Sequence, residues 1–146
     1  MTGGEPLLQK EVYPLMEGLL AAGKTVLLET GGHRSIEHVP PAVTIVMDVK
    51  CPGSGEAAKN DPLNLTRMRP HDEVKFVIRD RVDYEFAREI VQRERLPSRA
   101  AAVHFSPVHG VMDAKTLSEW VLQDRLPVRV QLQVHKYIWG PEVRGV

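Results

Sequence analysis

The stretch VTIVMDVKCPGSG, residues 43–55, decides the fold predicted for this chain. Residues 43–49 are mostly apolar and short enough for one buried strand, which ends between Asp48 and Lys50. The polar residues 51–62 that follow are rich in glycine and proline, which predicts a loop. A buried strand that runs directly into a polar loop is typical of parallel sheets, where such loops line one edge.

The same pattern of short apolar runs and polar turns continues on both sides of this stretch. Further strands are predicted at residues 25–29, 73–78, 101–105 and 129–134. Helices are predicted at residues 12–20, 83–93 and 114–124, with one helical turn at 35–39. Short strands separated by helices predict an α/β fold with a mostly parallel sheet and crossover helices.

Composition limits the class of protein. The chain has 146 residues, enough for one domain with a sizeable core, and we expect residues 1–146 to form a single domain. Its 19 basic and 19 acidic residues balance, which disfavours binding to nucleic acid. No apolar run is long enough to cross a bilayer and no leader is evident, so we expect a cytoplasmic protein with no membrane partner. The single cysteine, Cys51, can form neither an internal disulfide nor a cysteine metal site.

Four polar turns follow predicted strands or precede predicted helices, and all contain glycine. They are TGGEP (2–6), ETGGH (29–33), DVKCPGSG (48–55) and SPVHG (106–110). In parallel sheets ligands gather at the carboxyl ends of the strands, so these turns predict one binding edge. Each turn taken alone is equally explained by the preference of glycine and proline for turns.

The first of these turns suits a zwitterionic ligand such as an amino acid. Gly3 and Gly4 let the backbone approach a ligand closely, Glu5 can accept from an ammonium group, and Thr2 adds a hydroxyl. An ordinary turn, with Glu5 at the N-terminus of a helix, explains the spacing as well.

Acidic and basic residues at the next two strand ends have both a functional and a plain interpretation. Glu29 can accept the two hydroxyls of a ribose, or it can be a solvated charge. Lys50 can bind a carboxylate, or it can form an ion pair with Asp48.

The histidines do not predict a metal site. The six are spaced unlike any zinc motif. His104 lies within an apolar strand and is expected in the core, whereas His109 lies in a predicted binding turn.

Several of these stretches together resemble a known family. TGGEPLLQ, residues 2–9, is similar to the glycine-glycine-glutamate-proline turn of radical S-adenosylmethionine enzymes. Within that superfamily the chain resembles the 7-carboxy-7-deazaguanine synthases of queuosine and deazapurine biosynthesis. The further stretches that carry this resemblance are residues 26–37, 48–56, 72–78, 105–110 and 132–146.

The resemblance implies a fold and a reaction. The fold is a partial (β/α) barrel, of which this chain would be the later two-thirds, with the first strands missing. The reaction is a radical conversion of 6-carboxy-5,6,7,8-tetrahydropterin to 7-carboxy-7-deazaguanine with loss of ammonia, catalysed by a lyase. The cofactors implied are S-adenosylmethionine, a [4Fe–4S] cluster and Mg²⁺. The partners implied are the pterin substrate, an electron donor such as flavodoxin or ferredoxin, and a second copy in a homodimer.

Individual positions take roles from the same resemblance. Thr2 matches a residue that touches the substrate, and a larger set matches positions that bind S-adenosylmethionine. That set is Gly3, Gly4, Glu5, Asp48, Val49, Lys50, Ser106, Pro107, Val108 and His109, and Glu29 joins it because of its place at a strand end.

One large departure from the family concerns the cluster. The three cluster cysteines and the Mg²⁺ ligand are expected upstream of Met1, and Cys51 does not replace them. We therefore expect a fragment that is inactive alone, with an open sheet edge at residues 25–29. The alternatives are one subunit of a split enzyme, or a non-catalytic remnant that still binds S-adenosylmethionine.

Overall fold

The computed structural model describes residues 1–140, 142 and 143. Its centre is a five-stranded sheet in the order β1-β2-β3-β4-β5, and every neighbouring pair is parallel. The strands are β1 (Leu27–Thr30), β2 (Thr44–Val49), β3 (Glu73–Ile78), β4 (Ala102–Pro107) and β5 (Arg129–Val130). This all-parallel sheet with crossover helices confirms the α/β fold and its partial β/α form. All strand carboxyl ends therefore meet at one edge.

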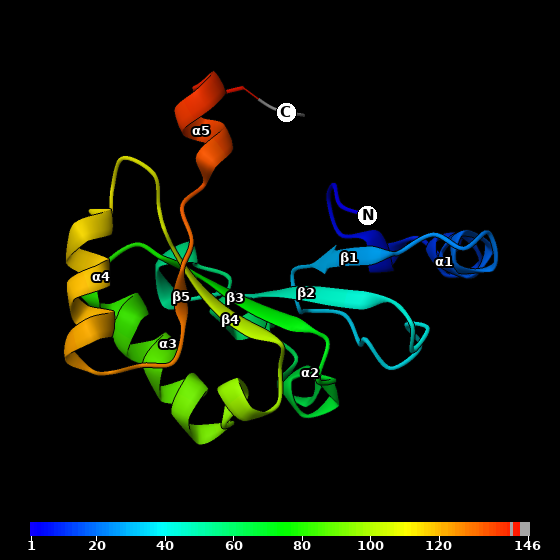
Figure 1. Cartoon of the computed structure of the whole chain (residues 1–146), viewed down its shortest axis with the longest axis horizontal. Coiled ribbons are helices and arrows are strands. Elements are labelled where there is room, and N and C mark those ends of the chain that lie inside the picture. The colour runs from blue at the N-terminus through cyan, green and yellow to red at the C-terminus, as the bar shows by residue number, and fades with distance from the viewer. Residues whose placement is uncertain (141, 144–146) are drawn as a thin grey trace.

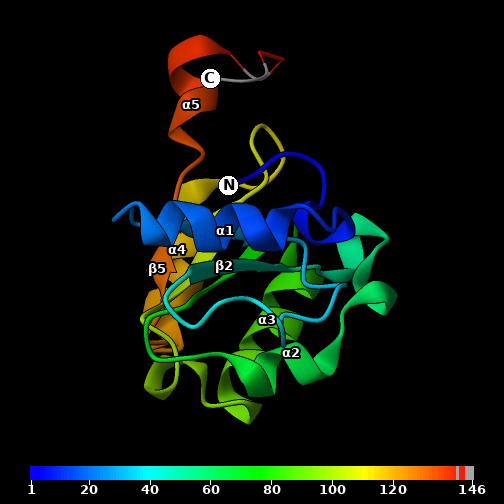
Figure 2. The same cartoon turned by 90° about the vertical axis from the view of Figure 1, so that its right-hand side faces the viewer.

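Helices cover one face of the sheet and its two ends. They are α1 (Val12–Ala21), α2 (Pro62–Arg67), α3 (Arg81–Arg93), α4 (Ala114–Gln123) and α5 (Val134–Trp139). Figure 1 shows α3 and α4 side by side near β3, β4 and β5, with α1 beyond β1 at the other end. Figure 2, from that end, shows α1 in front of β2 and α5 rising away from the rest of the molecule. None of the helices in the described residues is both long and apolar enough to cross a bilayer.

The core lies between the sheet and the crossover helices. Val74, Phe76 and Ile78 of β3 are fully buried, as are Tyr84 of α3 and Phe105 of β4. The Phe105 ring packs edge-on against Phe76 and Tyr84, with centroids 5.6 and 5.9 Å apart. These contacts fix α3 on the sheet, because aromatic rings bury large apolar areas in specific geometries.

The outer edge of β1 is partly covered. The Glu29 amide donates to the Met1 carbonyl at 2.9 Å, and the Met1 amino group donates to the Leu27 carbonyl. Met1 therefore pairs with β1 as a neighbouring strand would, along the edge that was predicted to be open.

Several boundaries differ from the sequence predictions. The last strand stops at Val130 rather than 134, residues 131–133 are irregular, and α5 begins at Val134. The predicted loop 51–62 contains two short 3₁₀ helices, Pro52–Ser54 and Ala57–Lys59, and ends at the start of α2, which was missed. Residues 35–39 form only a turn, so no helix occurs between β1 and β2 in residues 31–43. Residues 132–146, the last stretch of the resemblance, fall partly outside the described residues.

Candidate functional site

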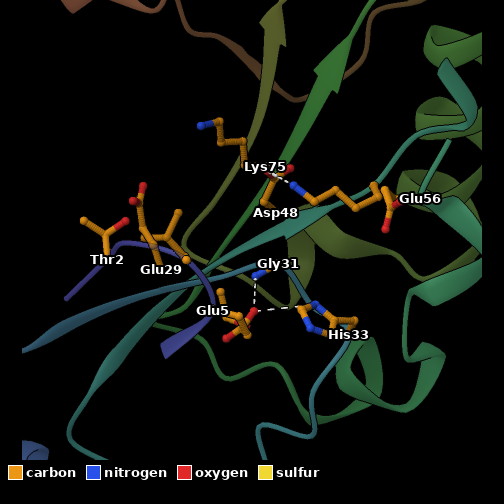
Figure 3. Close-up of a pocket in the computed structure, with 12 residues that line it drawn as sticks. Thr2, Glu5, Glu29, Gly31, His33, Asp48, Glu56 and Lys75 are labelled. Carbon is orange, nitrogen blue, oxygen red and sulfur yellow. Dashed lines mark hydrogen bonds and ion pairs between the residues drawn. The ribbon is translucent and has the colours of Figure 1, made fainter. Parts of the chain in front are cut away.

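A cavity of about 350 Å³ lies where β1, β2 and β3 approach their carboxyl ends. Most of the predicted site residues from the first three turns line it. They are Thr2, Gly4, Glu5, Glu29, Asp48 and Lys50. Pockets for small ligands begin at about this size. The cavity therefore brings together residues from three separated segments of the chain (Figure 3).

Glu5 joins the first turn to the end of β1. Its carboxylate accepts from the Gly31 amide at 2.8 Å and from the Thr30 hydroxyl at 2.9 Å. It also accepts from the Leu7 amide at 3.1 Å, as the N-cap of a 3₁₀ helix. Gly3 and Gly4, with φ of 105° and 61°, allow the sharp approach because side chains disfavour this left-handed region. Both interpretations of this turn are present at once, since Glu5 caps a helix and also lines the cavity.

The Asp48 and Lys50 side chains form the ion pair that was one of the two interpretations. Lys50 Nζ lies 2.7 Å from Asp48 Oδ2, and both side chains are partly exposed. Asn60 fixes the Lys50 backbone, since its side chain accepts from the Lys50 amide at 2.9 Å and donates to the Lys50 carbonyl at 2.8 Å. Asp48 Oδ1 is buried without a hydrogen-bond partner in the described residues. A buried oxygen of this kind lacks the hydrogen bond that such atoms usually have.

A second cavity of about 360 Å³ adjoins the first, because Asp48 and Lys50 line both. Val49, Val108 and the loop that begins at Cys51 complete its wall. The loop is held by Asp83, which is almost fully buried and accepts from the Gly53 amide at 2.7 Å. A Cβ atom at position 53 would lie 2.6 Å from Asp83 Oδ2, so any other residue there would have to displace the Asp83 carboxylate.

The SPVHG turn joins the site only in part. Ser106 and Pro107 belong to β4, not to the turn as predicted, and Ser106 is buried. The His109 ring packs edge-on against Tyr137 of α5, with centroids 4.8 Å apart. The structure does not bring Ser106, Pro107 or His109 to the wall of either cavity, and Gly3 lines a separate groove beside Val12.

Sequence reasoning missed other residues of the first cavity, namely His33, Glu56 and Lys75. Lys75 could have been found, because it alternates with the apolar Val74 and Phe76 in a predicted strand. His33 and Glu56 depend on how the turns fold. The role of Asn64 also becomes visible only in the folded chain. Its buried side chain accepts from the Ile36 amide and donates to the Gly32 and Arg34 carbonyls, which holds the turn after β1.

The comparisons with known proteins agree on one family. No family model matches the chain. A 7-carboxy-7-deazaguanine synthase of Koribacter versatilis is 48% identical over 159 residues, covering 100% of this chain and 70% of that protein. Its counterpart in Chlorobaculum tepidum is 40% identical over 100% of this chain and 67% of that protein. The chain belongs to the 7-carboxy-7-deazaguanine synthase family.

The relatives are longer than this chain. A 7-carboxy-7-deazaguanine synthase of Methanospirillum hungatei, also 40% identical, matches 97% of this chain over 58% of its own length. The family relationship therefore concerns the segment of the synthases to which residues 1–146 correspond.

The described residues fit one of the cofactors that the resemblance implies better than the others. Free acceptors, a cation and an unpartnered buried oxygen suit the polar groups of S-adenosylmethionine. A [4Fe–4S] cluster does not fit, because Cys51 is buried and its pKa is raised by that burial and by Asp83. Nor do residues 1–140, 142 and 143 contain a group of three or more metal-binding side chains.

Proposed function

We propose that this chain supplies the S-adenosylmethionine side of a 7-carboxy-7-deazaguanine synthase site. In this proposal residues 1–146 form one domain, the later two-thirds of a radical S-adenosylmethionine partial barrel. The reaction served is the conversion of 6-carboxy-5,6,7,8-tetrahydropterin to 7-carboxy-7-deazaguanine with loss of ammonia. The observation that carries the proposal is a match to the Koribacter versatilis synthase over 100% of the chain, together with the cavity that the matched turns line.

The residues around the cavity would hold the nucleoside by its polar groups. The Glu29 side chain, which is exposed and accepts no hydrogen bond from another described residue, would accept the ribose hydroxyls. Glu5 and the backbone of Gly3 and Gly4 would hold the methionyl amine, since a carboxylate has about four acceptor positions and can take further donors. Once bound, S-adenosylmethionine supplies the radical chemistry that names the superfamily.

The adjoining cavity extends the same site. Val49 and Val108 give it apolar walls, and the Cys51–Gly55 loop closes one side of it. In this proposal Val108 contacts the ligand. Its chain neighbours Ser106, Pro107 and His109 hold Val108 in place and do not contact the ligand themselves. Thr2 would face the pterin substrate from the first cavity.

The chain alone is proposed to be inactive. A [4Fe–4S] cluster needs thiolate ligands, and these 146 residues contain one cysteine, which is buried. Other residues, outside these 146, would bind the cluster and Mg²⁺ and would receive electrons from a donor such as flavodoxin or ferredoxin. The proposal includes a homodimer as the assembled form.

A chimeric enzyme tests the proposal. The part of the Koribacter versatilis synthase that this chain does not match would be joined to residues 1–146, reconstituted with iron and sulfide, and assayed anaerobically. We expect 7-carboxy-7-deazaguanine from the chimera and none from the 146-residue chain alone. The control carries Glu29→Ala in the chimera and should lose most of the activity. A folded chimera with a full cluster and no product would overturn the proposal, as would turnover by the isolated chain.

A further inference from the structure

A row of polar side chains crosses the sheet on the face away from the crossover helices. Asp48 of β2 lies opposite Lys75 of β3, and Lys75 lies opposite His104 of β4. Arg129 of β5 continues the row beside His104. Directly opposite residues in a sheet interact through their side chains, so the charges of this row must be considered together.

Two carboxylates flank Lys75 in the sheet, Asp48 on β2 and Glu73 on β3, and both are paired with other groups. Asp48 Oδ2 lies 2.7 Å from Lys50 Nζ. Glu73, on the same face of β3, lies 3.0 Å from His104 Nε2. No hydrogen bond or ion pair to Lys75 occurs within residues 1–140, 142 and 143, although its side chain is half-buried and lines the first cavity. An ammonium group that lines a cavity and has no protein partner is available to bind an anionic group of a ligand.

The surroundings of Lys75 point to an anionic group of a small molecule. In Figure 3 Lys75 extends away from Asp48 toward the side on which Thr2 and Glu29 lie. Asp48 Oδ1, beside it in the row, is the buried oxygen without a partner. A ligand that offers an anion to Lys75 and a donor to Asp48 would satisfy both groups.

We propose that Lys75 is the residue that selects for a carboxylate on the ligand of this cavity. The inference rests on the proposed function and adds to it the group that recognises charge. Lys50, the candidate from the sequence, is less suited because Asp48 already compensates its charge. The carboxylate has two sources in that function, the methionyl end of S-adenosylmethionine and the carboxyl group of the pterin.

Matched pairs of ligands test the role of Lys75. Calorimetry on the chain would compare S-adenosylmethionine with its decarboxylated form, and pterin-6-carboxylate with pterin. We expect the carboxylated member of at least one pair to bind about 10- to 100-fold more tightly, as for a hydrogen bond to a charged group. Lys75→Met should reduce that ratio to about 2 or less, whereas Lys75→Arg should keep most of it because it keeps the charge. If Lys75→Met lowers the ratio for the first pair, Lys75 binds the methionyl carboxylate. If it lowers the ratio for the second pair, Lys75 binds the carboxyl group of the pterin.

Two further variants make the test decisive. The Lys115 side chain on α4 is 82% exposed, so Lys115→Met removes an ammonium group far more open to solvent than that of Lys75. This variant should leave the affinity ratios of both ligand pairs unchanged. An unchanged ratio in folded Lys75→Met, or loss in Lys50→Met instead, would overturn the inference and leave the proposed function intact. A folded wild-type chain that binds none of the probes would overturn both.

Discussion

On β3, Val74, Phe76 and Ile78 are fully buried beneath the crossover helices, whereas Glu73, Lys75 and Val77 between them are only half-buried. The same alternation holds on β2, where Ile45, Met47 and Val49 are buried and Asp48 faces the cavity. Adjacent residues of one strand thus belong to two environments, since successive side chains point to opposite faces. Stability is expected to depend on the helix face and ligand binding on the cavity face.

Truncation of Phe76 breaks the helix face most directly. Phe76→Ala removes a fully buried ring from contact with Phe105, so we expect the free energy of unfolding to fall by about 3–5 kcal/mol. Its neighbour Lys75→Met should change that free energy by less than about 0.5 kcal/mol. Urea unfolding followed by circular dichroism measures both. Equal losses of unfolding free energy in the two variants would show that both faces of the sheet contribute equally to stability.

Asp83 tests the region where the two faces meet. Asp83→Ala leaves the Gly53 and Arg79 amides, now bonded at 2.7 and 3.0 Å, without their acceptor. We expect a loss of about 1–3 kcal/mol in the free energy of unfolding and faster hydrogen exchange at Gly53. Glu89→Ala, on the same helix with its side chain 73% exposed, is the control. Unchanged exchange at Gly53 would show that Asp83 does not hold the loop.

Asp113 tests stability remote from both faces, through pH. The Thr116 backbone amide, which donates to Asp113 at 2.9 Å, holds the pKa of Asp113 below its usual value. The ionised cap therefore contributes stability above that usual pKa of about 3.9, and the contribution is lost as pH falls through the lowered value. Asp113→Asn should be less stable than wild type at neutral pH, and the gap should close toward pH 2. A gap that stays constant in urea titrations across this range would contradict the prediction.

Glu29 should have the smallest effect on stability. Because its side chain is exposed on the cavity side, Glu29→Gln should leave the free energy of unfolding within about 0.5 kcal/mol of wild type. Affinity for S-adenosylmethionine should fall about tenfold, since neutral hydrogen bonds are weaker than charged ones. Calorimetry on the same samples measures this, and an unchanged affinity would remove Glu29 from the proposed site.

The sequence alone predicts the sheet well and the cavity partly. Strand 73–78 is confirmed to the residue because Val74, Phe76 and Ile78 alternate clearly. The last predicted strand, 129–134, begins where β5 begins but is too long, because pairing with β4 and not the alternation of its own side chains decides where β5 ends.

Within the site, the difference between Lys50 and Lys75 shows where sequence reasoning stops. Lys50 directly follows a predicted strand and Lys75 lies within the next one, and the sequence favours Lys50. The Asp48–Lys50 pair was one of the two interpretations of the sequence, but only the folded chain shows that Glu73 pairs with His104 and that Lys75 has no partner in the described residues. Partners of this kind depend on strand register, which no local pattern encodes.

The placement of Lys75 between Val74 and Phe76 also bears on misfolding. If β3 paired with its neighbours in a register shifted by one residue, the Lys75 ammonium group would be buried in the apolar layer and the Phe76 ring would face water. Both changes are unfavourable, so a charge that serves recognition in the native chain also penalises the nearest wrong arrangement during folding.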